Sequence, residues 1–186
     1  MHYQYREGIL TSYVFPYVFG SYLLMPINII ILTSIYTSNM AYSGRYKIKE
    51  PSKYDGNPAK VQYRSLWERQ CFKWCEASPG VKKWHSEETV IPYICGTDRK
   101  MHRYFMDLKI VWQDGSVTLV EIKPKKQTMK PDYKGRRTRK YISESMTYVK
   151  NQSKWSATRE YCLNRGWKFE IWTEDTLKQM GIRICK

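Results

Sequence analysis

The sequence predicts a mixed domain of the α/β (α+β) class, with one mixed sheet flanked by helices. The first observation is an amphipathic helix pattern that opens with a capping box. The second is a run of three strand-like segments. The third is a long helical stretch followed by one more strand and a short helix. This αβββαβα order is typical of helices packed around a single sheet, and 186 residues are enough for a hydrophobic core.

The segment YRSLWERQCFKWCE, residues 63–76, predicts the first helix. Ser65 followed by Glu68 fits a capping box, in which these side chains bond free backbone N–H groups of the first turn. Four residues at helical spacing form its apolar stripe: Trp67, Cys71, Trp74 and Cys75. The sequence Ser-Pro-Gly at 78–80 ends the helix.

Three strands are predicted next. Residues 89–94 contain Pro92, which favours a sheet edge or a bulge. Residues 103–112 follow, and every second residue makes an apolar face: Tyr104, Met106, Leu108, Ile110 and Trp112. Residues 116–123 come after the turn QDGS. The second and third strands are therefore expected to form a hairpin.

The remainder of the chain alternates between helix and strand. A loop rich in Lys, Arg, Pro and Gly covers residues 124–139. Residues 140–165 are mainly helical, with an expected break near 151–153, and they stop at Gly166. Residues 167–172 alternate as a strand, and Thr173 is the expected N-cap of a short final helix.

Net charge divides the chain into two parts. The sequence has 32 Lys and Arg against 17 Asp and Glu, a formal charge of +15, and a pI of about 9.6. Arg6 and Glu7 are the charged residues of segment 1–39, so the whole excess lies in residues 40–186. A charge of this size on a small domain predicts a polyanionic partner, most often nucleic acid.

Residues 1–39 form an apolar extension. Residues 8–39 form an uncharged run that is long enough to span a bilayer. Pro16, Gly20 and Pro26 interrupt the run, and it lacks the cleavage site of a signal peptide. The composition changes abruptly at Met40, and the stretch before it resembles translated AT-rich DNA. We favour Met40 as the true initiator over a membrane anchor or an ordered extension, and we expect no membrane association.

The segment after Met40 is expected to be an irregular basic arm, residues 40–62, ahead of the domain in residues 63–186. Five cysteines lie in this part of the chain, at positions 71, 75, 95, 162 and 185. Their odd number and the lack of paired CxxC spacing indicate reduced thiols in a cytosolic protein. A metal cluster of Cys95 with His85 and His102 is an alternative that we do not favour.

The end of the third strand carries Glu121 and Lys123 two residues apart. Residues i and i+2 of a strand point to the same face, so these two side chains project together while Ile122 turns toward the core. They could form an ordinary surface ion pair, which contributes about 0–1 kcal/mol. They could also be half of a metal-dependent active site.

The turn between the second and third strands decides where Asp107 lies. A two-residue Asp-Gly loop would put Asp107 and Glu121 on opposite faces of the sheet. A three-residue loop, 113–115, with Gly115 in the left-handed conformation pairs Trp112 with Ser116 and sets Asp107 opposite Glu121. We predict this loop or an equivalent bulge, since a slip of one residue separates the two carboxylates.

Two carboxylates this close repel, and each raises the pKa of the other unless a cation lies between them. Mg²⁺ fits such a site because it prefers carboxylate, water and phosphate oxygens, and Mn²⁺ could substitute. The Ile122 carbonyl could add a ligand. Lys123 would contact the attacking water or the scissile phosphate. This is the chemistry of metal-assisted phosphodiester hydrolysis.

The set Asp107, then Glu121-Ile122-Lys123 across a hairpin, preceded by Glu68 on a helix, resembles the PD-(D/E)xK nuclease superfamily. Neighbouring motifs are more specific. YRSLWE, ETVIPY, RYFMD and VEIKPKK, with MAYSG before them and FEIWTED after, resemble the head completion nucleases of T4-like tailed phages over about residues 40–182. The chain is more distantly similar to TnsA-type transposition endonucleases.

The resemblance implies a restriction-endonuclease-like αβββαβ core and a role for four residues. Asp107 and Glu121 would be metal ligands, and Lys123 would be the catalytic lysine. Glu68 would be the first-helix carboxylate, often bound through water, although it could simply cap its helix. Met106 stands before Asp107 where the family motif has Pro, and residues 1–39 have no counterpart.

The loop after the third strand and the start of the next helix carry eight candidate DNA-binding residues: Lys125, Lys126, Lys130, Lys134, Arg136, Arg137, Arg139 and Lys140. Beside a phosphodiesterase site, they are expected to contact the phosphates of double-stranded DNA, with strong salt dependence. The alternative is a solvated flexible segment. Tyr104, Tyr148 and Trp155 are candidates for stacking on bases.

Together, these features predict a Mg²⁺-dependent DNA endonuclease of a tailed phage that acts in head completion and processes or protects the end of packaged DNA. The expected partners are double-stranded DNA and phage head, portal or neck proteins. The expected location is the host cytoplasm during assembly and then the virion. A structural DNA-binding head or neck protein that does not cut is the main rival, and a protein anchored by residues 9–36 is a third interpretation.

Overall fold

The computed structural model describes residues 42–184. The predictions about the apolar extension, the Met40 initiator and Cys185 lie outside the described residues. Within the described range, no helix is both long enough and apolar enough to cross a membrane.

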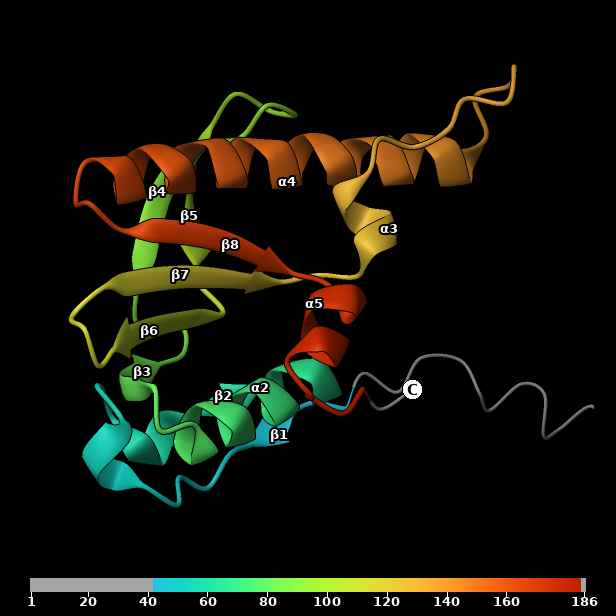
Figure 1. Ribbon diagram of the computed structural model, residues 1–186. Helices are drawn as coiled ribbons and strands as arrows, with labels where there is room; N and C mark the ends of the chain where they lie inside the picture. The colour runs from blue at the N-terminus through green and yellow to red at the C-terminus, as the bar shows by residue number, and fades with distance from the viewer. Residues whose placement is uncertain (1–41, 185–186) are drawn as a thin grey trace, which may run out of the picture. The chain divides into compact units, whose positions relative to one another are not determined.

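The central sheet has four strands in the order β3-β6-β7-β8 (Figure 1). They are β3 (Val81–His85), β6 (Leu108–Trp112), β7 (Val117–Ile122) and β8 (Lys168–Trp172). The first three are antiparallel neighbours, whereas β7 and β8 are parallel. The expected mixed sheet is therefore confirmed. The connection between the parallel strands is long enough to contain the helix α4 (Arg139–Leu163).

A separate two-stranded ribbon adjoins this sheet, formed by β4 (Val90–Ile94) and β5 (Met101–Phe105). The prediction of one strand over residues 103–112 is therefore wrong, because that segment splits into β5 and β6 around Asp107. Met106 N donates to Thr89 O at 3.0 Å, and Glu87 N donates to Met106 O at 2.9 Å. These two bonds lie where the chain passes from the β4–β5 ribbon to the central sheet, and Asp107 lies between β5 and β6.

The sequence pattern does not predict strand β3. In the central sheet, β3 occupies the position that was expected for the strand at residues 89–94, which instead forms β4 of the ribbon. Its sequence, VKKWH, has two exposed lysines at Lys82 and Lys83, which break the two-residue alternation. A bulge between Val81 and Lys83 in the pairing with β6 accounts for this pattern. Pro92 in β4 sits in the ribbon, away from the central sheet, as its missing N–H favours.

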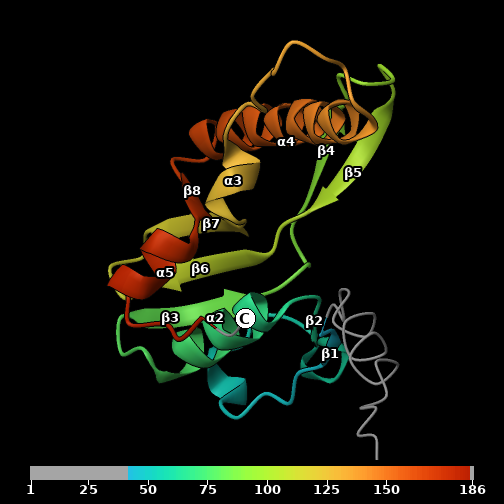
Figure 2. The ribbon, with the colours of Figure 1, turned by 90° about the vertical axis from the view of Figure 1, so that its right-hand side faces the viewer.

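Helices cover both faces of the sheet (Figures 1 and 2). On one face, α2 (Leu66–Ala77) and α5 (Glu174–Gln179) pack through Phe72 and Leu177 on residues such as Val120. On the other, α4 packs through Cys162 on Leu119 and on the β4–β5 ribbon. Leu119 and Val120 are successive residues of β7, so their side chains point to opposite faces and separate two hydrophobic clusters.

The capping box of α2 is confirmed. Glu68 N donates to Ser65 Oγ at 3.2 Å, and Arg64 N donates to the Glu68 carboxylate at 2.7 Å. In α4 the expected break at 151–153 is wrong: the helix is continuous, and Asn151 and Trp155 are buried in it. The final helix forms as predicted, but the side chain of Thr173 makes no capping bond.

Residues 42–62 have only short elements: β1 (Gly44–Arg45), β2 (Gln62–Tyr63) and the 3₁₀ turns η1 (Pro51–Lys53) and η2 (Pro58–Lys60). The segment is irregular, as expected, but it is packed. Tyr46 is buried, and its hydroxyl donates to Glu76 Oε2 at 2.5 Å. Glu76 Oε1 accepts from Lys49 N at 2.6 Å and from Glu50 N at 3.1 Å. One buried carboxylate of α2 therefore holds the segment.

Candidate active site

The β6–β7 turn has the predicted three-residue loop. Trp112 N donates to Ser116 O at 2.9 Å, and Gly115 adopts a positive φ of 83°. Leu108 is paired with Val120, and continuing this register by one residue sets Asp107 opposite Glu121. Glycine suits the turn because its positive φ costs no side-chain clash.

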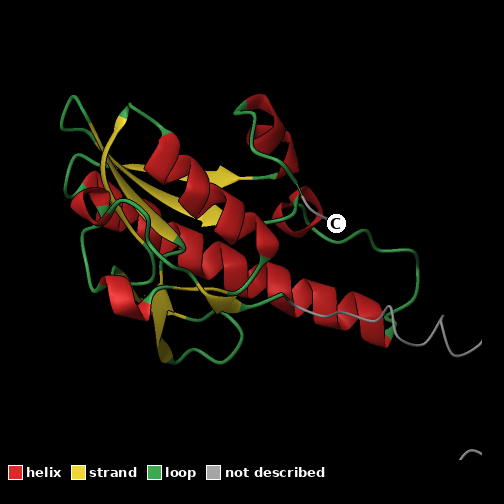
Figure 3. Cartoon of the chain, turned by 90° about the horizontal axis from the view of Figure 1, so that it is seen from below, coloured by secondary structure: helices red, strands yellow, loops and turns green. Residues whose placement is uncertain are grey.

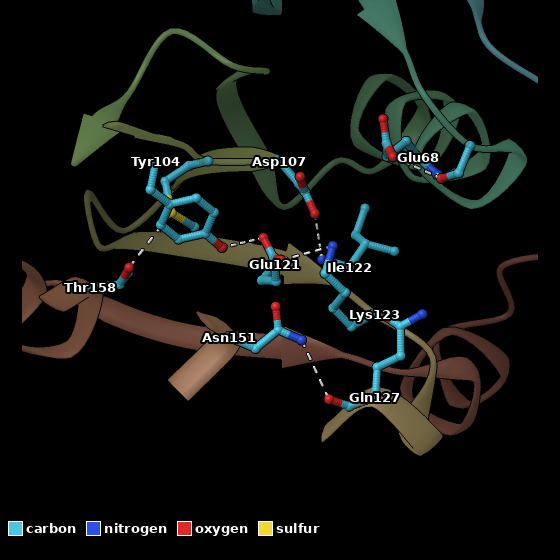
Figure 4. Close-up of polar contacts among 11 residues, drawn as sticks. Glu68, Tyr104, Asp107, Glu121, Ile122, Lys123, Gln127, Asn151 and Thr158 are labelled. Atoms are coloured by element: carbon cyan, nitrogen blue, oxygen red, sulfur yellow. Dashed lines mark hydrogen bonds and ion pairs between the residues drawn. The ribbon is translucent and has the colours of Figure 1, made fainter. Parts of the chain in front are cut away.

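Asp107 is held against the end of β7. Its Oδ2 accepts from the backbone N–H of Ile122 at 2.8 Å. Asp107 lies in the gap between β5 and β6, and its carboxylate reaches the neighbouring strand β7, which carries Glu121. Figure 4 shows this carboxylate between Glu121 and Glu68. Ile122 itself packs in the cluster beneath α2, as predicted.

Glu121 is the most enclosed ionisable group of the site, with 1% of its surface exposed. Its Oε1 lies 3.0 Å from Lys123 Nζ. Its Oε2 accepts a short hydrogen bond from the hydroxyl of Tyr104. Both carboxylate oxygens therefore have a partner supplied by the protein (Figure 4). Lys123 is partly exposed, so its ammonium lies between the buried carboxylate and solvent.

Burial and the neighbouring charges shift the pKa values of Asp107, Lys123 and Tyr104. Burial and then the negative charge of Glu121 raise the pKa of Asp107 well above its usual range. Burial alone would lower the pKa of Lys123, but the charges of Glu121 and Asp107 outweigh it and raise the pKa. Burial, then the charges of Glu121 and Asp107, raise the pKa of the Tyr104 hydroxyl, so it stays a hydrogen-bond donor.

Glu68 approaches from α2, on the other side of Asp107 (Figure 4). Burial raises its pKa, against the opposing effects of the hydrogen bonds from Arg64 N and Ser65 and of the Lys123 charge. The capping bonds hold the carboxylate in place. Capping and a role in the site are therefore compatible in one side chain.

Helix α4 adds side chains that the sequence pattern did not single out. Asn151 is buried and its amide donates to Gln127 O at 3.5 Å, which ties α3 (Lys125–Thr128) to α4 beside Lys123. Thr158 lies against Met106, and Lys154 Nζ lies 4.9 Å from the centre of the Tyr104 ring. Their spacing of i, i+3 and i+7 puts Asn151, Lys154 and Thr158 on one face of α4, and this spacing was the signal that could have indicated them.

Two of the three proposed base-stacking residues are wrong. Tyr104 and Trp155 are 4% and 1% exposed, so neither ring face is open to DNA. Tyr104 instead holds Glu121 from the interior. Tyr148 differs because it is half-buried on the wall of a surface cavity.

The eight basic residues lie on three elements. Lys125 and Lys126 belong to α3, and Arg139 and Lys140 open α4; the other four lie in the loop between them. Lys125 Nζ contacts Asp175 at 2.8 Å, and Lys126 Nζ contacts Glu144 at 3.2 Å. No ion pair involves the remaining six within residues 42–184: Lys130, Lys134, Arg136, Arg137, Arg139 and Lys140.

A second group of potential ligands lies at the tip of the β4–β5 ribbon. The ligand atoms of Cys95, Asp98 and His102 are within 4.8 Å of one another. Asp98 already pairs with His102 at 2.9 Å and accepts from Lys100 N at 3.0 Å. His85 is buried in β3 outside this group, so the cluster of Cys95 with both His85 and His102 is wrong.

The Asp107 site has the oxygen donors that a hard divalent cation requires. Two carboxylates lie opposite each other in the hairpin register, and a third stands nearby on α2. Burial, and then the negative charge of Glu121, raise the pKa of Asp107. Asp107 and Glu121, with Glu68 behind them, are the residues that would hold such an ion. The Ile122 carbonyl stays a predicted ligand.

A mixed sheet with an acidic pair and a lysine at the end of its central hairpin defines a restriction-endonuclease-like domain. The model of the TnsA-like endonuclease N-terminal family matches residues 78–174, just over half of the chain. The head completion nuclease of Enterobacteria phage T4 is 40% identical over 148 residues, which cover 77% of this chain and 99% of that protein. The chain belongs to the TnsA-like endonuclease family. No solved structure matches it significantly.

Proposed function

We propose that this chain is a Mg²⁺-dependent DNA endonuclease that acts in completion of a tailed-phage head. The main support is the site in which Asp107 and Glu121 face each other in the hairpin register and Lys123 contacts Glu121 at 3.0 Å. The name of the T4 relative supports the role in head completion. Mn²⁺ is expected to replace Mg²⁺ because both accept oxygen ligands.

When bound, the cation would lower the pKa of a water and neutralise charge on the reacting phosphate. The chain's own residues provide the rest. Asp107 and Glu121 fix the position at which substrate and cation meet. Lys123, held charged by its acidic neighbours, would stabilise negative charge that develops on the phosphate oxygens. Glu68, fixed by its capping bonds, would orient water from the α2 side.

The basic residues of the loop and of the first turn of α4 would hold the DNA backbone. Helix α4 has no acidic residue in its first turn, although acidic residues stabilise that end of a helix. Arg139 and Lys140 occupy it instead, where they favour phosphate binding over helix stability. The helix extends past the strands, so these residues lie at the protruding end of the domain (Figures 1 and 3).

The partners and location follow from this role. We propose double-stranded DNA as the polymer and head, portal or neck proteins as the assembly partners. The protein would act in the host cytoplasm during assembly and then remain in the virion. Its action would be to process or protect the end of packaged DNA.

Cleavage of supercoiled and linear duplex DNA by the full chain, with Mg²⁺ or with EDTA, tests the proposal. Asp107→Ala and Lys123→Ala are expected to bind DNA but not cut it, whereas Asp98→Ala, at the tip of the ribbon, is expected to cut like the wild type. DNA binding without cleavage by the wild type would favour a structural DNA-binding head or neck protein. Loss of cleavage in Asp98→Ala, with cutting by Asp107→Ala, would move the metal site to the ribbon.

A further inference from the structure

The loop between α3 and α4 encloses a cavity beside the candidate active site. Its volume is about 690 Å³, within the usual range of about 300–1,000 Å³ for small-ligand sites. Its wall begins at Lys126 and Gln127, three and four residues after Lys123. The Asn151 amide bonds Gln127 O, so the α3 turn that follows Lys123 is tied to α4 and also lines the cavity. In Figure 2 the loop arches over α4 above α3.

The cavity wall combines flat apolar surfaces with cations. The apolar and aromatic part comes from Met129, Pro131, Tyr141 and Tyr148. Five basic and two acidic side chains also line it, a net charge of +3: Lys126, Lys130, Lys134, Arg136 and Lys140, with Asp132 and Glu144. Such a combination of base-sized apolar faces and phosphate-binding cations is how proteins hold single-stranded nucleic acid.

The two tyrosines occupy one face of α4, at positions i and i+7. The ring of Tyr141 packs against Tyr133, with centroids 5.2 Å apart, so part of its surface is covered. Tyr148 is half-buried and makes no ring contact with another aromatic or cationic side chain within residues 42–184. Tyr148 lies one helical turn before Asn151 and therefore at the end of the cavity next to the candidate active site.

We propose that this cavity binds an unpaired nucleotide, and that the preferred substrate is DNA with a single-stranded end, gap or flap. The inference rests on the proposed function insofar as DNA is the polymer bound. The base would stack on Tyr148 and the adjoining phosphates would contact Lys130, Lys134 and Arg136. A fully paired duplex presents phosphates but no free base, and extruding one costs a few kcal/mol. The cavity therefore discriminates against blunt duplex ends.

Binding in EDTA tests this proposal without cleavage. The probes are a blunt duplex and the same duplex with an unpaired overhang that carries 2-aminopurine. The full chain is expected to bind the overhang about 5- to 150-fold more tightly and to quench the 2-aminopurine fluorescence by stacking. Tyr148→Ala is expected to lose this preference, whereas Tyr148→Phe keeps it because the ring remains. Met146→Ala, exposed on the same helix, is the matched control.

Equal affinity of the wild type for both probes, or an unquenched probe, would overturn the proposal even if Tyr148→Ala failed to fold. An equal loss of affinity for both probes in Tyr148→Ala would also overturn it. Mg²⁺-dependent cutting of the blunt duplex, without any preference for the overhang, would leave the endonuclease function in place and remove only the inference. Tighter binding of the overhang without any Mg²⁺-dependent cutting would support the inference and contradict the endonuclease function.

Discussion

At the residue scale, the candidate site brings the carboxylates of Asp107, Glu121 and Glu68 together around one lysine, so their negative charges repel one another. Asp107 accepts one backbone hydrogen bond, yet burial and Glu121 keep its pKa well above normal. Glu121 is enclosed but compensated by Lys123 and Tyr104. A buried or crowded carboxylate costs free energy of folding, and proteins accept this cost mainly at functional sites.

Asp107→Asn is therefore expected to stabilise the metal-free protein while it abolishes cleavage. A group whose pKa is higher in the folded state stabilises the fold fully below its unfolded pKa, and this contribution is lost as the pH rises through the folded pKa. The wild type thus loses this contribution as the pH rises above about 4, the usual Asp value, whereas the Asn variant has no carboxyl at this position. The melting temperature in EDTA should rise by about 2–4 °C at pH 7, or about 1 kcal/mol. A difference between the two proteins that is as large at pH 4 as at pH 7 would contradict this explanation.

Tyr104→Phe is expected to weaken the response to Mg²⁺, because the hydroxyl orients the Glu121 carboxylate from behind. Removing such an outer hydrogen bond typically costs about 10- to 100-fold in metal affinity or activity. The Mg²⁺ concentration that gives half-maximal cleavage measures the effect. Tyr93→Phe is the control, since Tyr93 is buried in the same ribbon but does not bond Glu121. The same Mg²⁺ requirement in both variants would remove Tyr104 from the site.

The sequence placed the three charged residues of the hairpin but not the tyrosine behind them. Asp107, Glu121 and Lys123 could be related because strand periodicity and a Gly-containing turn determine local register. Tyr104 meets Glu121 only because β5 leaves the direction of β6 at Asp107. That change of direction depends on pairing with β4, a tertiary contact that periodicity does not report.

At the element scale, the same limits explain which strands could be predicted. The β7 and β8 segments alternate or are continuously apolar, and their bounds followed from turns and glycine. Strand β3 was not predicted because its two exposed lysines interrupt the apolar alternation. The break between β5 and β6 was not predicted because residues 103–112 keep an unbroken apolar alternation. A polar stretch in α4 suggested a helix break, but Asn151 is buried because it bonds the α3 backbone.

The loop between α3 and α4 carries a prediction about DNA affinity. Replacing Lys134, Arg136 and Arg137 with Gln is expected to reduce the slope of log affinity against log salt by about 0.9 for each phosphate that the variant no longer neutralises. The folded structure should hardly change, because these three side chains are exposed. Replacing Lys47, Lys73 and Lys82, also exposed, is the matched control of equal charge. An equal slope for the two triple variants would show that the loop does not contact the phosphates.

At the scale of the whole molecule, residues 42–62 are part of the described fold rather than a free arm. Tyr46, Tyr54 and Val61 enter the cluster beneath the sheet, together with Phe72 and Trp84. Glu76 binds both the Tyr46 hydroxyl and two backbone N–H groups of this segment. Basic composition and turn residues predicted its irregular backbone but could not report that its aromatic residues are buried.

Tyr46→Phe is expected to lower the free energy of unfolding by about 1.5–3 kcal/mol, because it removes a hydrogen bond to a charged, buried carboxylate. Urea denaturation of the full chain measures the change. Tyr42→Phe serves as the control, since Tyr42 is exposed. Unchanged stability in Tyr46→Phe would mean that this segment does not contribute to the cooperative unit.

The central claim is that Asp107 and Glu121 hold a divalent cation for DNA cleavage, and locating that ion tests it most directly. Crystals of the full chain soaked in Mn²⁺ would give an anomalous signal at each bound ion. The structure predicts a peak between the carboxylates of Asp107 and Glu121 that is lost in Asp107→Ala. A peak at Cys95, Asp98 and His102, with none beside Asp107 at Mn²⁺ concentrations that support cleavage, would contradict the account.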